Sequence, residues 1–335
     1  MEKLQEVVQA ARKTAAVADL TERGKFRVVG SERKSWFHGM TSNTVNDLEP
    51  GAGNYGTILT DRGKVVSDYR LIVRPGFLLF DVEPSLREKV FGHLNRFLIS
   101  EDAELQDVTE QWGLLHLFGP AAGDLLRQVF GVTAPPIDPY SSIERGEWII
   151  SRINRFGEWG YDLWLPPAAS ASVLERLHNA GVPQAEEPAL EVLRLESGIP
   201  RCTVDFDENI IPLEAQLHHA ISYKKGCYVG QEIVARMHFR GHPNKLLVGL
   251  RLPVQEPPEP LTDLYADPKA ERRSGWITSA AYSPTLGCVV GLGYVRVQLA
   301  EPGNQLLWRR EGDAVPVEVV ATPLLGENEM IPEPD

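Results

Sequence analysis

The residues with the clearest potential for chemistry lie in one stretch around a single cysteine. From Lys224 the sequence reads Lys-Lys-Gly-Cys-Tyr-Val-Gly-Gln-Glu-Ile-Val-Ala-Arg and ends at Arg236, so two glycines bracket Cys227. Glycine lets the backbone turn tightly and bring a thiol close to a ligand. Lys224, Lys225 and Arg236 supply positive charge, which lowers the pKa of a thiol and raises its reactivity. A second interpretation stays open, in which Cys227 is a small buried hydrophobic side chain and the cations form a solvated face.

Two other patterns resemble functional sites but lack the context that such sites need. Glycines at 51, 53 and 56 match G-x-G-x-x-G, yet the strand-like residues 57–59 follow where a phosphate-binding helix should begin. His238 and His242 have the spacing of a zinc pair, but the glycine and proline around His242 argue against a helix there. We therefore predict neither a dinucleotide site nor a metal site.

Composition and charge exclude several classes of function. The chain has 335 residues, with 34 basic and 46 acidic side chains, for a net charge of −12. This charge repels phosphate backbones, so we expect no direct nucleic-acid binding. No run reaches the roughly 18 apolar residues of a membrane span, and residues 1–13 lack the apolar core of a secretory signal. With only three scattered cysteines, these observations favour a soluble, cytoplasmic protein with reduced thiols.

The elements that must position these residues alternate between helices and strands without βαβ regularity, which predicts an α+β fold. Apolar residues recur at helical spacing after residue 4, and three short apolar runs then predict an antiparallel meander. The expected strands are 55–59, 65–73, 77–82, 114–118, 148–153 and 161–165, and the expected helices are 4–15, 86–98, 121–130, 170–179 and 188–197.

The texture changes after residue 245 to short apolar runs broken by proline and glycine, which predicts a small C-terminal β-barrel at 246–335. Its tail from residue 326 is acidic and expected to fray. The preceding region, 1–245, is predicted to contain two lobes, with possible boundaries near 50 and 137, where the chain is rich in glycine or proline. Oligomeric state is left open.

The cysteine stretch resembles the K-G-C-[FY]-x-G-Q-E-x-x-x-R signature of YgfZ-type proteins, which are folate-binding relatives of the glycine-cleavage aminomethyltransferase (GcvT-like) superfamily. The resemblance extends over nearly the whole chain and implies a multi-lobed fold of this superfamily, with tetrahydrofolate as its ligand. The matching segments are 27–30, 51–68, the R-L-E-x-G element at 193–200, Pro212-Leu213-Glu214, 276–284 and 291–295.

The resemblance also implies roles for four residues besides Cys227. Glu196, the glutamate of R-L-E, is expected to bind the pterin ring, because a carboxylate accepts two parallel N–H donors. Lys225 is expected to pair with the anionic end of folate, and Arg236 is expected either to do the same or to order the loop. Aminomethyltransferases carry an Asp-Asp pair after the glycine turn, where this chain has Ser67-Asp68. Asp68 therefore keeps a proton-relay role only if it matches the working carboxylate.

These signals lead to three functional hypotheses. The first is a tetrahydrofolate-binding accessory protein for iron–sulfur cluster assembly or repair, serving iron–sulfur enzymes as clients, with Cys227 as the functional thiol. The alternative is an aminomethyltransferase that passes a one-carbon unit from a lipoyl carrier to tetrahydrofolate, supported by the shared scaffold, Glu196 and Asp68. The third is a factor in tRNA modification, acting through an iron–sulfur enzyme because the net charge opposes RNA binding.

Overall fold

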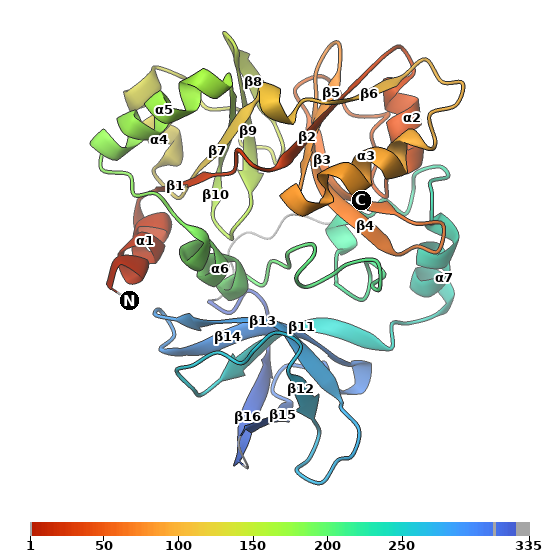
Figure 1. The fold of residues 1–335 in the computed structure, drawn as a ribbon, viewed down its shortest axis with the longest axis vertical. Coiled ribbons are helices and arrows are strands. Elements are labelled where there is room, and N and C mark those ends of the chain that lie inside the picture. Colours follow the sequence, from red (N-terminus) through yellow and green to blue (C-terminus); the bar gives the residue numbers. More distant parts are fainter. Residues whose placement is uncertain (1, 311–312, 326–335) are drawn as a thin grey trace.

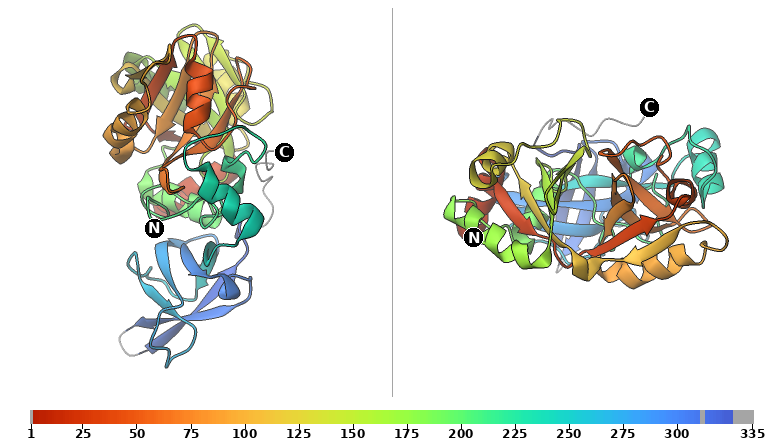
Figure 2. Two further views of the ribbon diagram at one scale, coloured as in Figure 1. Left: turned by 90° about the vertical axis from the view of Figure 1, so that its right-hand side faces the viewer. Right: turned by 90° about the horizontal axis from the view of Figure 1, so that it is seen from above.

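The computed structural model describes residues 2–310 and 313–325. Two five-stranded antiparallel sheets lie side by side, and a closed β-barrel lies beneath both (Figure 1). Seen from the side and from above, the two sheets form one layer over the barrel (Figure 2). The expected α+β class with antiparallel sheets, helices and a C-terminal barrel is confirmed. The predicted acidic tail lies outside the described residues.

The first sheet has the order β3-β4-β5-β2-β6, and the face that is turned away from the second sheet packs against helices α2 and α3. Its strands contain the predicted meander, because β3, β4 and β5 pair in sequence. Nearly all of their side chains are buried, which explains their continuous apolar runs. These elements are β2 (Gly24–Val29), α2 (Arg33–Met40), β3 (Gly53–Leu59), β4 (Val65–Val73), β5 (Leu78–Val82), α3 (Arg87–Asn95) and β6 (Glu104–Asp107).

The second sheet has the order β1-β7-β10-β9-β8 and carries helices α4 and α5 on its outer side (Figure 1). The predicted hairpin is the β9–β10 pair, in which Ile150 lies opposite Leu163. These elements are β1 (Ala16–Asp19), β7 (Gly113–Phe118), α4 (Ala122–Phe130), β8 (Ser142–Arg145), β9 (Trp148–Asn154), β10 (Trp159–Leu165) and α5 (Pro167–Asn179).

The sheet topology corrects the two possible lobe boundaries. The first sheet is built from residues 24–107, so residue 50 lies within it. The second sheet combines residues 16–19 with 113–165, so residue 137 lies inside a connection of that sheet. Strand pairing over long sequence distances, which local composition does not report, decides where the lobes divide.

Between the sheets and the barrel lie helices α1 (Glu2–Lys13) and α6 (Glu187–Glu196), followed by a long irregular segment and α7 (Gln231–Arg240). Helix α6 ends where the sequence predicts, since Gly198 adopts φ +70° just after it. Helix α7 was not expected, because Gly241 and Pro243 argue against a helix and lie just after its end. It includes His238 and stops at Arg240, before Gly241.

The barrel closes in the order β11-β14-β13-β12-β15-β16. Among the residues that the structure describes, ten buried apolar side chains form its own core, and other barrel residues, such as Leu292 and Tyr294, pack into the core of the first sheet. Its strands are β11 (Lys245–Leu252), β12 (Asp263–Tyr265), β13 (Gly275–Ser283), β14 (Cys288–Arg296), β15 (Gln305–Arg310) and β16 (Asp313–Val320). Within the described ranges, no helix has the length and apolar character needed to cross a membrane.

Candidate functional site

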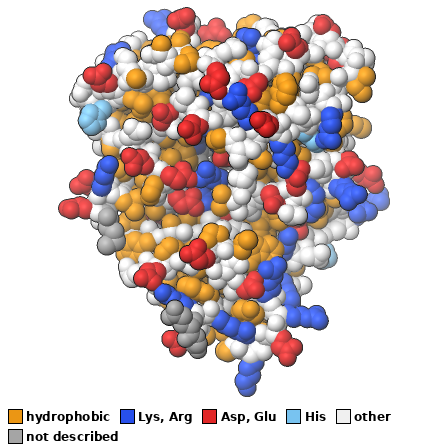
Figure 3. Space-filling model, in the orientation of Figure 1, with side chains coloured by type: hydrophobic (Ala, Val, Ile, Leu, Met, Phe, Trp, Pro, Cys, Tyr) orange, Lys and Arg blue, Asp and Glu red, His pale blue; other side chains and the backbone are white. Residues whose placement is uncertain are grey.

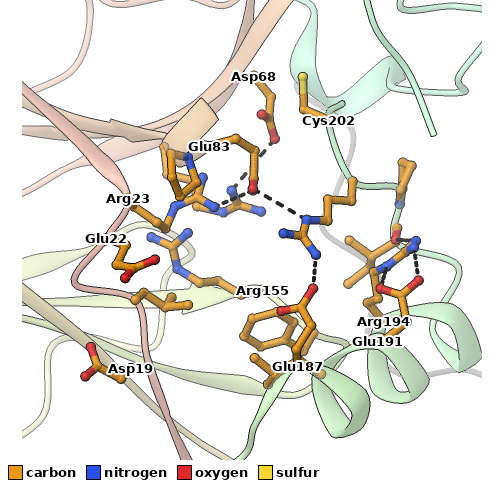
Figure 4. Close-up of a pocket in the computed structure, with 18 of the residues that line it drawn as sticks. Asp19, Glu22, Arg23, Asp68, Glu83, Arg155, Glu187, Glu191, Arg194 and Cys202 are labelled. Atoms are coloured by element: carbon orange, nitrogen blue, oxygen red, sulfur yellow. Dashed lines mark hydrogen bonds and ion pairs between the residues drawn. The ribbon is translucent and has the colours of Figure 1, made fainter. Parts of the chain in front are cut away.

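A cavity of about 380 Å³ lies where both sheets meet helix α6 (Figure 4). Its size falls within the range of small-molecule pockets. The lining combines many charged side chains with a few apolar ones. The lining residues are Asp19, Leu20, Thr21, Glu22, Arg23, Asp68, Arg70, Glu83, Pro84, Arg155, Phe156, Glu187, Leu190, Glu191, Arg194, Ile199, Pro200, Arg201 and Cys202.

Asp68, in the middle of β4, is the carboxyl group best placed for acid–base chemistry. It is 4% exposed, and its Oδ2 accepts a hydrogen bond from the Tyr55 hydroxyl at 3.0 Å. Its Oδ1 has no hydrogen-bond partner among the described residues. Burial raises the pKa of Asp68 above its ordinary value, and Arg70 and Arg23 offset part of that effect. The group is thus suited to hold and release a proton nearer neutral pH than an exposed aspartate.

The neighbouring Ser67 points to the other side of the sheet, because successive side chains of a strand face opposite ways. It is fully buried, does not line the cavity, and donates a hydrogen bond to the Asp68 carbonyl at 2.7 Å. Only one residue of the Ser67-Asp68 pair can therefore reach the cavity, and that residue carries the carboxylate.

A buried ion network forms the back wall of the cavity. Arg155, at the end of β9, joins the two sheets, because its Nη2 donates to Asp81 at 2.8 Å and to Asp162 at 2.5 Å. Arg23 also pairs with Asp81, and His116 Nδ1 lies 2.8 Å from Asp162. Burial alone would raise the pKa of Asp81, but Arg155 and Arg23 outweigh it and lower that pKa. Both sheets are thereby held in one orientation around the cavity.

Helix α6 forms the opposite wall, and a second buried cluster ties it to the barrel. Arg194 Nη1 donates to Asp205 at 2.7 Å, and Asp205 Oδ1 accepts from Thr278 and Ser279 at 2.5 and 2.6 Å. Near the opening, Arg201 pairs with Glu187 and with Glu83.

Glu196 does not lie in this cavity, which corrects its predicted position. Its side chain is fully buried, with Arg12 Nη2 donating to Oε2 at 2.5 Å and Ser283 donating to Oε1. The helix phase explains the difference. At about 100° per residue, Glu196 lies roughly 200° around α6 from Arg194, on the face that packs against α1 and the barrel. The carboxylate joins three parts of the fold and has no oxygen free for a pterin.

The cysteine loop also lies apart from the cavity, since none of Lys225, Cys227 and Arg236 lines it. Cys227 is exposed, and Arg236 is exposed on α7. Lys225 is directed inward, where its Nζ donates to three backbone carbonyls, those of His38, Thr41 and Asn43, at 2.5, 2.6 and 2.9 Å. Burial lowers the pKa of Lys225 to about 7. Its contacts hold the loop to α2, and they leave no free donor for a folate carboxylate.

Sequence reasoning missed several residues of the cavity, including Arg23, Arg155 and Cys202, and also Tyr55, which hydrogen-bonds Asp68. Cys202 is buried in the wall near Asp68, and burial raises the pKa of its thiol well above the ordinary value. Tyr55 stands opposite Arg70 in the β3–β4 pairing, a register that the predicted meander contained. The sequence did contain a signal for these residues: Arg23 and Arg155 flank apolar strands, and a charge that is buried with such a strand needs a partner of opposite charge.

Comparison with known proteins identifies the family. Residues 1–225 match the GCVT N-terminal domain and residues 245–325 match the glycine cleavage T-protein C-terminal barrel domain. The chain therefore belongs to the glycine cleavage T-protein family.

Two relatives bear the name aminomethyltransferase. The protein from Rubrobacter xylanophilus is 31% identical over 97% of this chain and 87% of its own length. The protein from Pelodictyon phaeoclathratiforme is 30% identical over 89% of this chain and 84% of its own length. The crystal structure of glycine cleavage system aminomethyltransferase T from Bartonella henselae has the same fold, with a TM-score of 0.89 at 21% identity, covering 96% of this chain and 89% of that one.

These relatives correct the leading functional hypothesis. An iron–sulfur accessory role was predicted, but proteins about 30% identical over nearly the full chain are named aminomethyltransferases. The iron–sulfur interpretation is therefore wrong, its proposed client enzymes are unsupported, and the tRNA-modification alternative gains no support either. The predicted alternative, the aminomethyltransferase, agrees with the relatives.

Proposed function

We propose that this chain is a folate-dependent aminomethyltransferase, with the cavity beside Asp68 as its active site. The substrates would be an aminomethyl group carried as a thioether on a lipoyl carrier and tetrahydrofolate. The observation that carries the proposal is the buried Asp68 carboxyl, whose Oδ1 lacks a partner among the described residues at the wall of a ligand-sized cavity.

The reaction moves one carbon and two protons. The methylene carbon leaves sulfur and the amine nitrogen and becomes bonded to two folate nitrogens. Each of those nitrogens loses its proton, and the two protons end on the lipoyl thiol and on ammonia. A buried carboxyl with a raised pKa can accept a proton from a folate nitrogen and pass it to a leaving group. The Tyr55 hydroxyl holds that carboxyl in one orientation.

The cavity wall offers what a folate ring requires. A pterin presents adjacent N–H donors, and carboxylate oxygens are strong acceptors for them. Six carboxylate side chains line the cavity, while Phe156 and Leu190 provide apolar surface against which a flat ring can pack. Because Ser67 faces away from the cavity, its difference from the Asp-Asp pair removes no carboxylate from this site.

The test is a turnover assay with purified lipoyl carrier loaded with aminomethyl groups and tetrahydrofolate. We expect ammonia and methylenetetrahydrofolate in equal amounts. Asp68→Asn should lower turnover by about 10²–10⁴-fold, the usual contribution of a positioned acid–base group. Asp138→Asn removes an exposed carboxylate outside the cavity and should turn over like the wild type. Absence of any product from the wild-type protein would rule out the proposal.

The finer resemblance, to the YgfZ-type branch of the family, rests on the loop from Lys224 to Arg236. We propose that this loop marks the branch and takes no part in aminomethyl transfer, because Cys227 is exposed and outside the cavity lining. Cys227→Ala should then have the kcat and KM of the wild type in the same assay. A fall in kcat would place the thiol in the reaction.

A further inference from the structure

The charges around the cavity are not evenly matched. Five arginines line it, and four of them, Arg23, Arg155, Arg194 and Arg201, are already paired with carboxylates within hydrogen-bonding distance. The fifth, Arg70, has its Nη1 3.8 Å from Asp68 Oδ2. Six carboxylates share the lining, and further carboxylates, such as Asp81 and Asp162, contact the arginines from behind. The cavity thus contains an excess of negative charge.

The carboxylates that have no cationic partner in the described part of the chain lie at the opening of the cavity, on the connection between β1 and β2. Asp19 and Glu22 both line the cavity and both are exposed. Neither forms an ion pair with any residue in the ranges 2–310 and 313–325, although Asp19 Oδ1 accepts the Thr21 N–H at 2.9 Å. Figure 4 shows both carboxylates on the left side of the cavity, Glu22 just below Arg23 and Asp19 further down. Figure 3 shows acidic and basic side chains side by side near the middle of this face of the molecule.

Apolar side chains line the cavity together with these two carboxylates. Leu20 lies between them in the sequence, and Leu190 and Phe156 line the cavity from α6 and from the β9–β10 connection. At the inner end lies Asp68, which is 4% exposed and whose Oδ1 has no partner among the described residues. The lining thus combines unpaired carboxylates with apolar side chains, a combination that suits an alkyl chain with a cationic end.

We propose that Asp19 and Glu22 form a cation-selecting rim, which favours entry of a protonated amine at the end of an alkyl chain and disfavours uncharged analogues. The inference rests on the proposed function, in which the lipoyl arm carries such an aminomethyl group. The rim acts on the approach and binding of the arm, because unpaired carboxylates at a cavity mouth raise the local concentration of cations. Asp19 and Glu22 are therefore specificity residues, and Asp68 remains the group that contacts the reacting atoms.

A binding experiment with stable probes tests the rim without requiring turnover. The cationic probe is dihydrolipoamide alkylated on one sulfur with a 2-aminoethyl group, and the neutral probe carries a 2-hydroxyethyl group instead. Calorimetric titration gives the ratio of their affinities for the wild type, for D19N/E22Q and for E22Q alone. The matched control is D138N/E175Q, which removes two exposed carboxylates outside the cavity lining and changes the net charge equally.

We expect the wild type to prefer the cationic probe and the double variant to lose about fivefold of that preference, because exposed charges attract a bound cation only weakly. The preference of the wild type should also shrink at about 0.5 M salt, where surface charges are screened. E22Q alone should lose part of it, and D138N/E175Q none. The proposal is wrong if folded D19N/E22Q keeps the wild-type preference for the cationic probe, or if the wild type binds both probes equally.

The two proposals fail in different ways. If the wild type shows the charge preference but produces no methylenetetrahydrofolate, the transferase function falls and the cation-selecting rim stands. If turnover is normal while both probes bind equally, the cation-selecting rim is refuted and the transferase function stands.

Discussion

The hydrogen bond from Tyr55 to Asp68 gives the sharpest prediction. It joins two buried groups at 3.0 Å, and it stabilises the ionised form of the carboxyl. Hydrogen bonds to charged groups contribute about 1.5–3 kcal/mol, and part of this persists with the protonated acid. Since one pKa unit corresponds to about 1.4 kcal/mol, Tyr55→Phe should raise the pKa of Asp68 by about one unit.

Carbon NMR of protein labelled at the aspartate carboxyl carbon measures this shift directly. Asp68→Asn assigns the signal, and Tyr161→Phe, on the second sheet and outside this cavity, serves as the control. The acidic limb of the pH–rate profile should move upward by the same amount as the pKa, because ionisation of the same carboxyl controls both. An unchanged or lowered pKa in Tyr55→Phe would show that burial and the arginines alone set the titration of Asp68.

Three further predictions concern stability. Arg12→Met leaves the buried Glu196 without its cation and should lower the free energy of unfolding by about 3 kcal/mol in urea titrations. An effect below about 1 kcal/mol would show that the Arg12–Glu196 pair does not hold the parts of the fold together. Gly230→Ala should lower the free energy of unfolding by about 2–3 kcal/mol, because φ is +84° and a Cβ would lie 2.5 Å from a backbone oxygen. Gly226→Ala is the control and should leave the free energy of unfolding nearly unchanged, because a Cβ there meets no atom within 4 Å. Lys225 has a folded pKa of about 7 against an ordinary 10.5, so between these values the unfolded chain binds more protons and stability should rise with pH. Lys225→Met should make that rise smaller in thermal melts across the window without removing it, because the buried Lys25 has a lowered pKa of about 8 and acts in the same direction. A wild-type pH dependence in the variant would contradict the prediction.

Much of the fold was available from local patterns. Runs of buried residues predicted β3, β4 and β5 to within two residues, and helical spacing located α1, α4 and α6. The position and type of these elements follow from local sequence, because turn residues mark their ends and the spacing of apolar residues distinguishes strand from helix. The sequence does not predict helix α7, because Gly241 and Pro243, which argue against a helix, lie just beyond its end at Arg240.

Local patterns were enough to place Asp68 on a strand beside a serine and Glu196 at the end of a helix. The packing of the whole fold was needed to show that Asp68 faces a cavity, while Glu196 turns toward Arg12 and Ser283. The reason is geometric: a strand or helix fixes the relative directions of its own side chains, but packing decides which direction meets a cavity and which meets a neighbouring element. The carboxylates of the site therefore became distinguishable only when two sheets, α6 and the barrel were brought together.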